Sequence, residues 1–216
     1  MTASAADRQQ GMAGRAAAGV RPSARDGRAV LLTTAAWFVV AFGLGAAGVF
    51  KNIRPPLPQI ILATLTAAVL ILFWTPTPLR RWALAVDPRA LVLIHVTRFV
   101  GFYFLWLYSR GELPWAFAVP GGWGDIAVAT TAILVCLLTR PDAGSWRGVL
   151  IAWNVFGLID ILMVVATAVR LAVADPGSMA ALLVVPLSLL ISFLVPIIIA
   201  THVIIFVKTL GARGDV

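Results

Sequence analysis

The last apolar stretch of the chain decides its class. Residues 184–207 read VVPLSLLISFLVPIIIATHVIIFV, and His202 is the one ionisable side chain among them. A helix needs about 20 consecutive, mostly apolar residues to cross the ~30 Å hydrocarbon core of a bilayer. This stretch meets both conditions of length and composition, so we expect it to form a transmembrane helix.

Other stretches of the chain have the same character. They cover approximately residues 29–50, 57–75, 89–108, 120–139 and 149–170. Prolines such as Pro56, Pro78 and Pro141 stand in the breaks between them, where the chain is expected to turn. The whole chain is 61% hydrophobic and only 12% charged, which is outside the range of soluble globular domains. We therefore predict an all-α membrane protein with six transmembrane helices.

The two ends of the chain differ from this apolar part. Residues 1–28 are rich in Ala, Gly and Ser with scattered Arg, a composition that is typical of a disordered basic tail. Residues 209–216 form a short polar segment. The predicted organisation is a disordered tail over 1–28, a six-helix transmembrane domain over 29–208, and a C-terminal tail over 209–216.

The position of the basic residues predicts the orientation. With the N-terminus inside the cell, four Lys and Arg fall in outer loops and twelve fall on the cytoplasmic side. The outer residues are Lys51, Arg54, Arg110 and Arg170, and the cytoplasmic residues are Arg8, Arg15, Arg21, Arg25, Arg28, Arg80, Arg81, Arg89, Arg140, Arg147, Lys208 and Arg213. Cytoplasmic loops carry the excess of Lys and Arg. We expect both termini to be cytoplasmic, in the plasma (inner) membrane of a bacterium.

The same distribution explains the formal net charge of +8. The basic residues lie in the tail and the short loops rather than on one face, so the charge does not indicate nucleic-acid binding. The expected surroundings are the lipid bilayer and, in addition, a second copy of the chain or a membrane partner subunit.

Polar residues inside the predicted spans are the best candidates for function. Charged groups in hydrocarbon are costly, and they usually pair, face the bundle interior or line a pathway. At about 1.5 Å per residue, His95, Asn154 and His202 come from three helices but lie at a similar depth, nearer the cytoplasmic side. The full candidate cluster is His95, Arg98, Asp125, Asn154, Asp160 and His202.

Arg98 and Asp160 are predicted to form a buried ion pair. Both lie near the membrane midplane, and Arg98 follows His95 by one turn on the same face of the third helix. Asp125 has two possible positions. It could be the N-cap of the fourth helix in an outer loop. A helix that began after it would be only about 21 Å long, so we favour a helix that begins at Pro120 and places Asp125 inside the membrane.

Pro196 is expected to bend the sixth helix. Proline has no backbone N–H, so the carbonyl of Ser192, four residues earlier, loses its partner inside the helix. That carbonyl needs a partner from elsewhere, because an unsatisfied backbone group within a bilayer is costly.

These polar residues belong to a longer pattern of spaced residues. It consists of His95-x-x-Arg98-x-x-Gly101, Leu113-Pro114-x-x-Phe117-Ala118-x-Pro120-x-Gly122-x-Gly124-Asp125, Trp153-Asn154-x-x-Gly157-x-x-Asp160, and Pro196 followed by His202. Over about residues 90–205 it resembles a family of uncharacterised bacterial six-span integral membrane proteins. The resemblance implies that the polar positions belong together, and it implies no reaction, substrate or cofactor.

Three functions remain open on the sequence alone. The polar cluster could fix the register of the helices in a structural or partner subunit. It could instead form a ladder of proton-titratable groups in a small transporter, in which Arg98 would hold an anionic substrate and release Asp160 to take up a proton. The third possibility is a membrane-embedded enzyme or redox protein.

That third possibility has two versions. His95 and His202 could ligate haem b, since haem takes axial ligands from facing helices at matched depth. Alternatively His95, Asp160 or His202 could perform acid–base chemistry on a lipid or an isoprenoid. The single cysteine, Cys136, excludes an internal disulfide. We expect no metal site, because Asp160 should lie several Å deeper than the two imidazoles.

Overall fold

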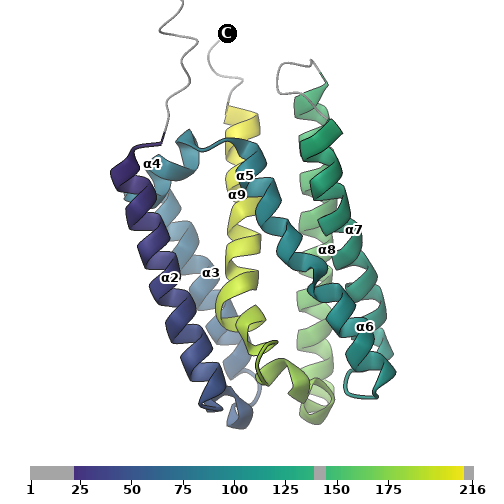
Figure 1. Ribbon diagram of the computed structural model, residues 1–216. Coiled ribbons are helices and arrows are strands. Elements are labelled where there is room, and N and C mark those ends of the chain that lie inside the picture. The colour runs from purple at the N-terminus through teal and green to yellow at the C-terminus, as the bar shows by residue number, and fades with distance from the viewer. Residues whose placement is uncertain (1–21, 139–144, 212–216) are drawn as a thin grey trace, which may run out of the picture.

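In the computed structural model, residues 22–138 and 145–211 are described, and every regular element in this part of the chain is a helix (Figure 1). Six of these helices are long and apolar enough to cross a membrane, which confirms a multi-pass membrane protein. They are Ala24–Ala46, Leu57–Trp74, Pro88–Ser109, Trp115–Leu138, Trp146–Ala174 and Leu190–Gly211. Most of the predicted basic tail, and the end of the C-terminal tail, lie outside the described residues.

The first two spans form one edge of the bundle. Helix α2 (Ala24–Ala46) begins within the region predicted as tail, where the Ser23 side chain caps it by accepting from the Arg25 backbone N–H. It ends earlier than the predicted residue 50, because Gly48 takes φ 73° and a 3-10 turn, η1 (Val49–Asn52), follows. Only glycine adopts a positive φ at little cost, which explains the end of the helix here. Helix α3 is Leu57–Trp74.

A short helix outside the predicted spans ties the two sides of the bundle together. Helix α4 (Pro78–Ala85) begins after Thr77, whose side chain accepts from the Arg80 N–H. The Lys208 ammonium group donates to the carbonyls of Ala83, Leu84 and Val86 at 2.9, 2.6 and 2.8 Å. These carbonyls belong to the end of the short helix, where a cation is favourable. The start of α4 is joined to α2 by Arg81, which pairs with Asp26 at 2.7 Å.

The third span has three segments rather than one. Helix α5 (Pro88–Ile94) is capped by Asp87, the 3-10 segment η2 (His95–Val100) follows, and helix α6 (Gly101–Ser109) completes the crossing. In Figure 1 this span runs obliquely, from beside α9 at one end to beside α7 at the other. A 3-10 segment in the middle of a helix often marks a functional site. Here it carries both His95 and Arg98.

The fourth span begins earlier than predicted. Helix α7 (Trp115–Leu138) starts at Trp115 rather than at Pro120, so Pro120 lies inside the helix. The backbone N–H groups of Phe117 and Ala118 both donate to the Pro114 carbonyl, at 3.1 and 3.0 Å. The helix can therefore start at this turn, and Pro120 removes only a single bond near its beginning. Helix α8 (Trp146–Ala174) continues well beyond the predicted residue 170.

The last span also differs from its prediction. Residues 176–183 form a 3-10 segment, η3 (Pro176–Leu183), and the membrane helix starts only at the π-helical turn η4 (Leu190–Leu194), which leads into α9 (Val195–Gly211). The Ser192 carbonyl, which Pro196 deprives of its helical partner, accepts from the Trp37 indole N–H of α2 at 2.9 Å. The expected external partner of this carbonyl is thus present.

Two apolar clusters make up the core, and the polar residues lie between them. One cluster includes Phe73, Leu91, Trp146, Leu150 and Ile205, and the other includes Phe104, Phe117, Met179, Leu187 and Ile198. The buried polar side chains between them include Arg98, Asp125, Asn154 and His202.

Candidate functional site

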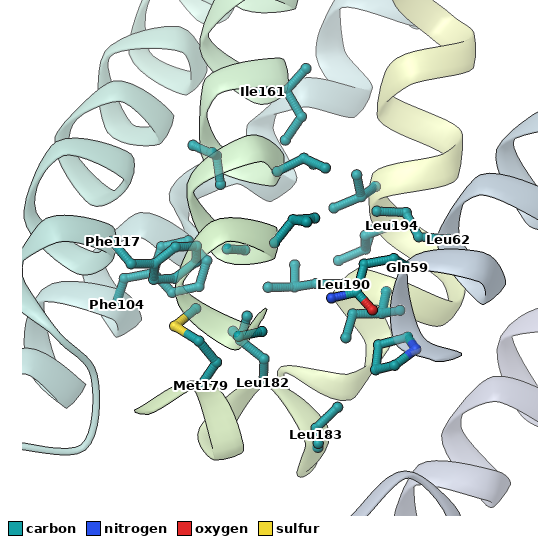
Figure 2. Close-up of a pocket in the computed structure, with 18 of the residues that line it drawn as sticks. Gln59, Leu62, Phe104, Phe117, Ile161, Met179, Leu182, Leu183, Leu190 and Leu194 are labelled. Carbon is teal, nitrogen blue, oxygen red and sulfur yellow. The ribbon is translucent and has the colours of Figure 1, made fainter. Parts of the chain in front are cut away.

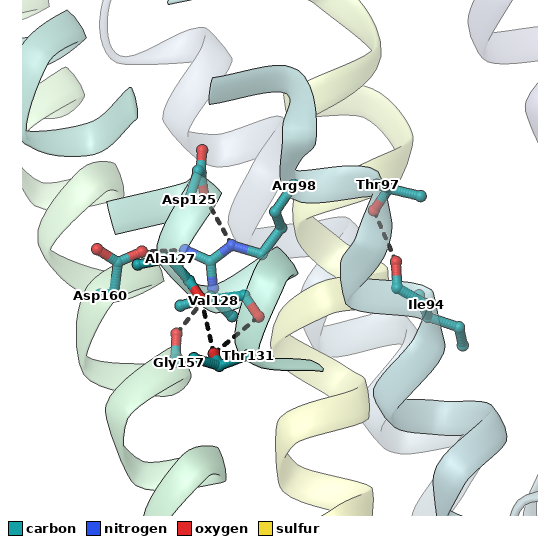
Figure 3. Close-up of polar contacts among 9 residues, drawn as sticks. All are labelled: Ile94, Thr97, Arg98, Asp125, Ala127, Val128, Thr131, Gly157 and Asp160. Atoms are coloured by element: carbon teal, nitrogen blue, oxygen red, sulfur yellow. Dashed lines mark hydrogen bonds and ion pairs between the residues drawn. The ribbon is translucent and has the colours of Figure 1, made fainter. Parts of the chain in front are cut away.

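Arg98 is the centre of a buried charged trio with Asp125 and Asp160 (Figure 3). Its Nε lies 2.6 Å from Asp125 Oδ1, one Nη pairs with Asp160 Oδ2, and the other donates to the Gly157 carbonyl at 3.0 Å. The Arg98 side chain is 1% exposed, and those of Asp125 and Asp160 are 4% and 17% exposed. The predicted Arg98–Asp160 pair is confirmed, and a second carboxylate shares the same guanidinium.

Asp125 lies inside the membrane domain and is not an N-cap. It is in the middle of α7, and its carboxylate faces Arg98 from the neighbouring span. The favoured position is therefore confirmed, although the helix begins at Trp115.

Glycines allow the three helices of the trio to come close together. A Cβ atom on Gly101 would overlap the backbone oxygen of Gly122, so α6 and α7 touch backbone to backbone at this point. A Cβ atom on Gly124 would overlap the Asp160 carboxylate. Small residues of this kind are the usual means of close helix approach in membranes. The glycine-rich stretch before Asp125 thus provides the space in which the trio assembles.

His95, Asn154 and His202 also come together, as their predicted depth requires. The two imidazole rings have centroids 4.2 Å apart, and Trp153 packs edge-on against His95 at 5.1 Å. Asn154 Nδ2 donates to the His202 carbonyl at 3.0 Å, and its Oδ1 lies 2.7 Å from His202 Nδ1. All three residues have no exposed surface. We refer to these residues and Thr201 as the histidine layer.

The hydrogen bonds define a neutral tautomer for each imidazole. Because Asn154 Nδ2 must donate to a carbonyl, its Oδ1 is the atom that accepts from His202 Nδ1–H. Thr201 donates its hydroxyl proton to the Ile198 carbonyl at 2.9 Å, so it accepts from His95 Nε2–H at 3.2 Å. His95 Nδ1 and His202 Nε2 have no hydrogen-bond partner in the described structure. Each of these two atoms therefore offers a buried lone pair to a proton.

Gly157 connects the histidine layer to the trio. Its carbonyl accepts from Arg98, and a Cβ atom on it would lie only 2.7 Å from His202 Cε1. This contact was not predicted from the sequence, because every residue type has a backbone carbonyl that can accept a hydrogen bond. The only signal was the spacing Asn154-x-x-Gly157-x-x-Asp160, which places the three residues along one face of α8.

The histidine pair does not fit haem. A porphyrin ligated by two histidines must lie between their rings, and centroids 4.2 Å apart leave no such space. Within residues 22–138 and 145–211, no group of three or more His, Cys, Asp or Glu is placed to hold a metal ion.

An apolar cavity reaches the trio from one end of the bundle. We call it the Gln59 cavity; its volume is about 110 Å³, and Arg98 and Asp125 lie in its wall. Most of the remaining wall is apolar, as Figure 2 shows for Leu62, Phe104, Phe117, Ile161, Met179, Leu182, Leu183, Leu190 and Leu194. Gln59 is an exception, and its buried Oε1 has no hydrogen-bond partner in the described structure. Gln59 was not predicted as a site residue, since a polar residue so near the start of a span does not by itself indicate a site.

A second and larger cavity lies on the other side of the bundle. It has a volume of about 790 Å³ and is bounded by α2, α3, α4, α5 and α9. We call it the Trp37 cavity. Thr201 reaches its wall, but neither histidine ring lines this cavity or the Gln59 cavity.

Comparison with known proteins places the chain in a family. The model of the domain of unknown function DUF8737 matches residues 55–210, which is more than half of the chain. The chain belongs to the DUF8737 family. The DUF8737 match starts at Pro55 and so includes the charged trio and the histidine layer, while α2 precedes it. Neither a curated protein nor a solved structure matches the chain.

Proposed function

We propose that this protein is a compact transporter of the bacterial plasma membrane, which exchanges a small lipophilic organic cation for a proton at the charged trio. The observation that carries the proposal is that the buried Asp125 and the partly buried Asp160 share one guanidinium at the end of an apolar cavity. The proposed orientation has both termini in the cytoplasm, on the basis of the Lys and Arg distribution.

The charges of the trio determine the kind of substrate. With both Asp125 and Asp160 ionised, one guanidinium leaves a net charge of −1 in a buried site, which is costly. The trio becomes neutral when it binds one proton or one other monovalent cation. Proton and substrate therefore compete for the same excess charge, which is the basis of exchange.

The same geometry disfavours an anionic substrate. Arg98 already has acceptors from Asp125, Asp160 and the Gly157 carbonyl. An anion would have to displace a carboxylate from Arg98 and leave that carboxylate without a counter-charge, at a cost of several kcal/mol. The possibility that Arg98 holds an anion is therefore less consistent with the structure.

The walls of the Gln59 cavity favour an organic cation over a metal ion. Apart from Arg98, Asp125, Gln59 and Thr97, the lining is composed of apolar side chains and prolines. Mg²⁺ and Ca²⁺ need about six or more oxygen ligands, which this wall does not offer. A tetraalkylammonium ion needs no oxygen ligands, is less strongly hydrated than a divalent metal ion and gains apolar contacts, so its charge can lie near Asp125 while its alkyl chains lie against the wall.

The histidine layer provides a route for the proton. In the proposed orientation the Gln59 cavity faces the outside, since it lies beside the η1 and η3 connections, and the histidine layer lies on the cytoplasmic side of the trio. His95 Nδ1 and His202 Nε2 are free to accept a proton, and His202 packs against Gly157, whose carbonyl is bound to Arg98. A proton that leaves the trio can reach the cytoplasmic half of the bundle through these rings.

Calorimetry with tetraalkylammonium ions tests the proposal. Purified protein in detergent is titrated with tetramethyl-, tetraethyl- and tetrapropylammonium in two buffers of different ionisation enthalpy. We expect binding that strengthens with alkyl chain length until the cavity is filled, and release of about one proton per cation bound. Asp125→Asn keeps an acceptor for Arg98 but removes the excess charge, so it should weaken binding at least about tenfold, equivalent to ~1.4 kcal/mol.

Glu112→Gln is the matched control. Glu112 lies in an exposed loop with a 46% exposed side chain, so its neutralisation removes the same charge outside the cavity. The affinity of this variant should equal that of the unchanged protein. Binding without proton release, or equal affinity in Asp125→Asn and Glu112→Gln, would contradict the exchange mechanism.

A second candidate function is a structural or partner subunit. Polar contacts join η2 to α7 and α8 through Arg98, α8 to α9 through Asn154 and His202, and η2 to α9 through His95 and Thr201. Such a network fixes helix register. For this function, Asp125→Asn would lower stability or partner binding, and no tetraalkylammonium ion would bind.

A further inference from the structure

The Trp37 cavity is an unassigned and mostly apolar feature. Its lining includes Val30, Trp37, Val69, Leu72 and Ile204, and the residues with polar side-chain atoms in the lining are threonines and two tryptophans. With a volume of about 790 Å³, it is far larger than the packing defects of protein interiors. It does not depend on the charged trio, none of whose residues lines it.

The cavity arises because α2 is held at its ends. The main contacts of α2 are with α4, through Asp26 near its start, with η4, through Trp37 in its middle, and with η1. At one end the Asp26–Arg81 ion pair fixes it, and further along Trp37 donates to the Ser192 carbonyl and packs on Phe193 with ring centroids 5.0 Å apart. Between these attachments α2 does not pack closely against α3 or α9. The cavity occupies this gap.

The cavity is open to the hydrocarbon of the bilayer. Leu31 lines it and is nevertheless 67% exposed, so the wall on the α2 side is incomplete. Water has too few polar partners there to fill such a volume. A flexible hydrocarbon chain can enter between the helices and fill it. A transmembrane helix, at about 10–12 Å in diameter, would have to pass the attachments that close both ends of the gap.

One end of the cavity carries an excess of positive charge. Thr77, Pro78, Leu79 and Trp82 form the lining at this α4 end. Arg25 and Arg28 in the first turns of α2, and Arg80 and Arg81 in α4, belong to the same end, and Asp26 is the acidic residue among them. Asp26 pairs with Arg81, and Arg80 donates to the Phe73 carbonyl at 3.2 Å, whereas Arg25 and Arg28 are exposed. Arg25 and Arg28 therefore leave an excess of positive charge at the α4 end of the cavity.

We infer that the Trp37 cavity binds one anionic phospholipid, with an acyl chain between α2, α3 and α9 and the phosphate beside Arg25 and Arg28. Arginine pairs with phosphate through parallel N–H donors, and apolar burial holds the chain. Each basic residue near a membrane surface contributes ~1 kcal/mol toward an anionic lipid, which corresponds to about a fivefold preference.

Native mass spectrometry of the protein, released from nanodiscs of equal parts phosphatidylglycerol and phosphatidylcholine, tests this inference. We expect one retained phosphatidylglycerol per chain. Ala68 lines the cavity and Ala67 does not, so Ala68→Trp should lose the retained lipid while Ala67→Trp keeps it. These two adjacent residues, both exposed in the described structure, form a matched pair for the volume of the cavity.

A series of arginine-to-glutamine variants tests whether the arginines bind the lipid headgroup. Arg25→Gln and Arg28→Gln should each reduce the preference for phosphatidylglycerol over phosphatidylcholine about fivefold. Arg110→Gln, at the opposite end of the bundle, should leave it unchanged. Helical content by circular dichroism and a single chromatographic peak establish that each variant folds. The inference is overturned if the unchanged protein retains no lipid, retains both lipids equally, or loses lipid alike in the two tryptophan variants.

Discussion

Removal of the Arg98 guanidinium tests whether the charged trio is an electrostatic unit. Arg98→Met keeps much of the side-chain length but leaves Asp125 and Asp160 buried without a counter-charge. Loss of one partner from a buried ion pair costs about 3–5 kcal/mol, and here three acceptors lose their donor together. We expect Arg98→Met to lower the free energy of unfolding by about that amount.

The companion variant is the triple substitution Arg98→Met, Asp125→Asn and Asp160→Asn. It removes all three charges, so it should recover about half or more of the stability that Arg98→Met loses, although each polar group alone contributes little in a membrane. The loss in Arg98→Met should also shrink as the pH falls, because a protonated carboxyl group needs no counter-charge. The triple variant should not show this pH dependence.

Reversible unfolding in mixed detergent micelles, followed by far-UV circular dichroism, measures these free energies. The single carboxyl substitutions complete the thermodynamic cycle. Losses that add within about 0.5 kcal/mol across the single, double and triple variants would show that the three residues do not interact, and would refute the trio as a unit.

Three further variants test separate contacts. Gly157→Ala places a Cβ atom 2.7 Å from His202 Cε1, so it should displace that ring and destabilise the fold by about 1–3 kcal/mol, measured by unfolding. Trp37→Phe removes the donor to the Ser192 carbonyl and should cost about 1 kcal/mol in the same assay, whereas Trp74→Phe on the exposed end of α3 should cost less. Asn154→Leu should leave His202 Nδ1 without its acceptor and shift its ring proton resonances, observed by NMR of histidine-labelled protein.

The sequence predicted the architecture because span length and composition follow directly from the thickness of the bilayer. The predicted Arg98–Asp160 pair follows from matched depth, and the intramembrane position of Asp125 follows from the length that a helix needs to cross the bilayer. The calculated depths also predicted that His95, Asn154 and His202 lie in one layer. These predictions need only the rise of a helix and the direction of each crossing.

The remaining features depend on how the helices pack sideways, which depth does not determine. Hydropathy does not indicate the 3-10 segment from His95 to Val100, the π-helical turn at Leu190–Leu194 or the start of α7 at Trp115, because each is a local feature of the backbone. The Gln59 cavity and the Trp37 cavity exist because neighbouring helices diverge. The residue pattern of one span does not predict where that span diverges from its neighbour and leaves a cavity.

The 3-10 segment has a mechanical consequence for the bundle. A 3-10 turn rises about 2.0 Å per residue and holds three residues, against about 1.5 Å and 3.6 residues in an α-helix. His95 and Arg98, three residues apart, are therefore stacked directly above one another along the span. If the six residues of η2 rewound as an α-helix, α6 would move about 3 Å toward α5 and rotate by about 120°. The third span thus changes its helical pitch at its centre, and a change of pitch there would move Arg98 of the trio relative to His95 of the histidine layer.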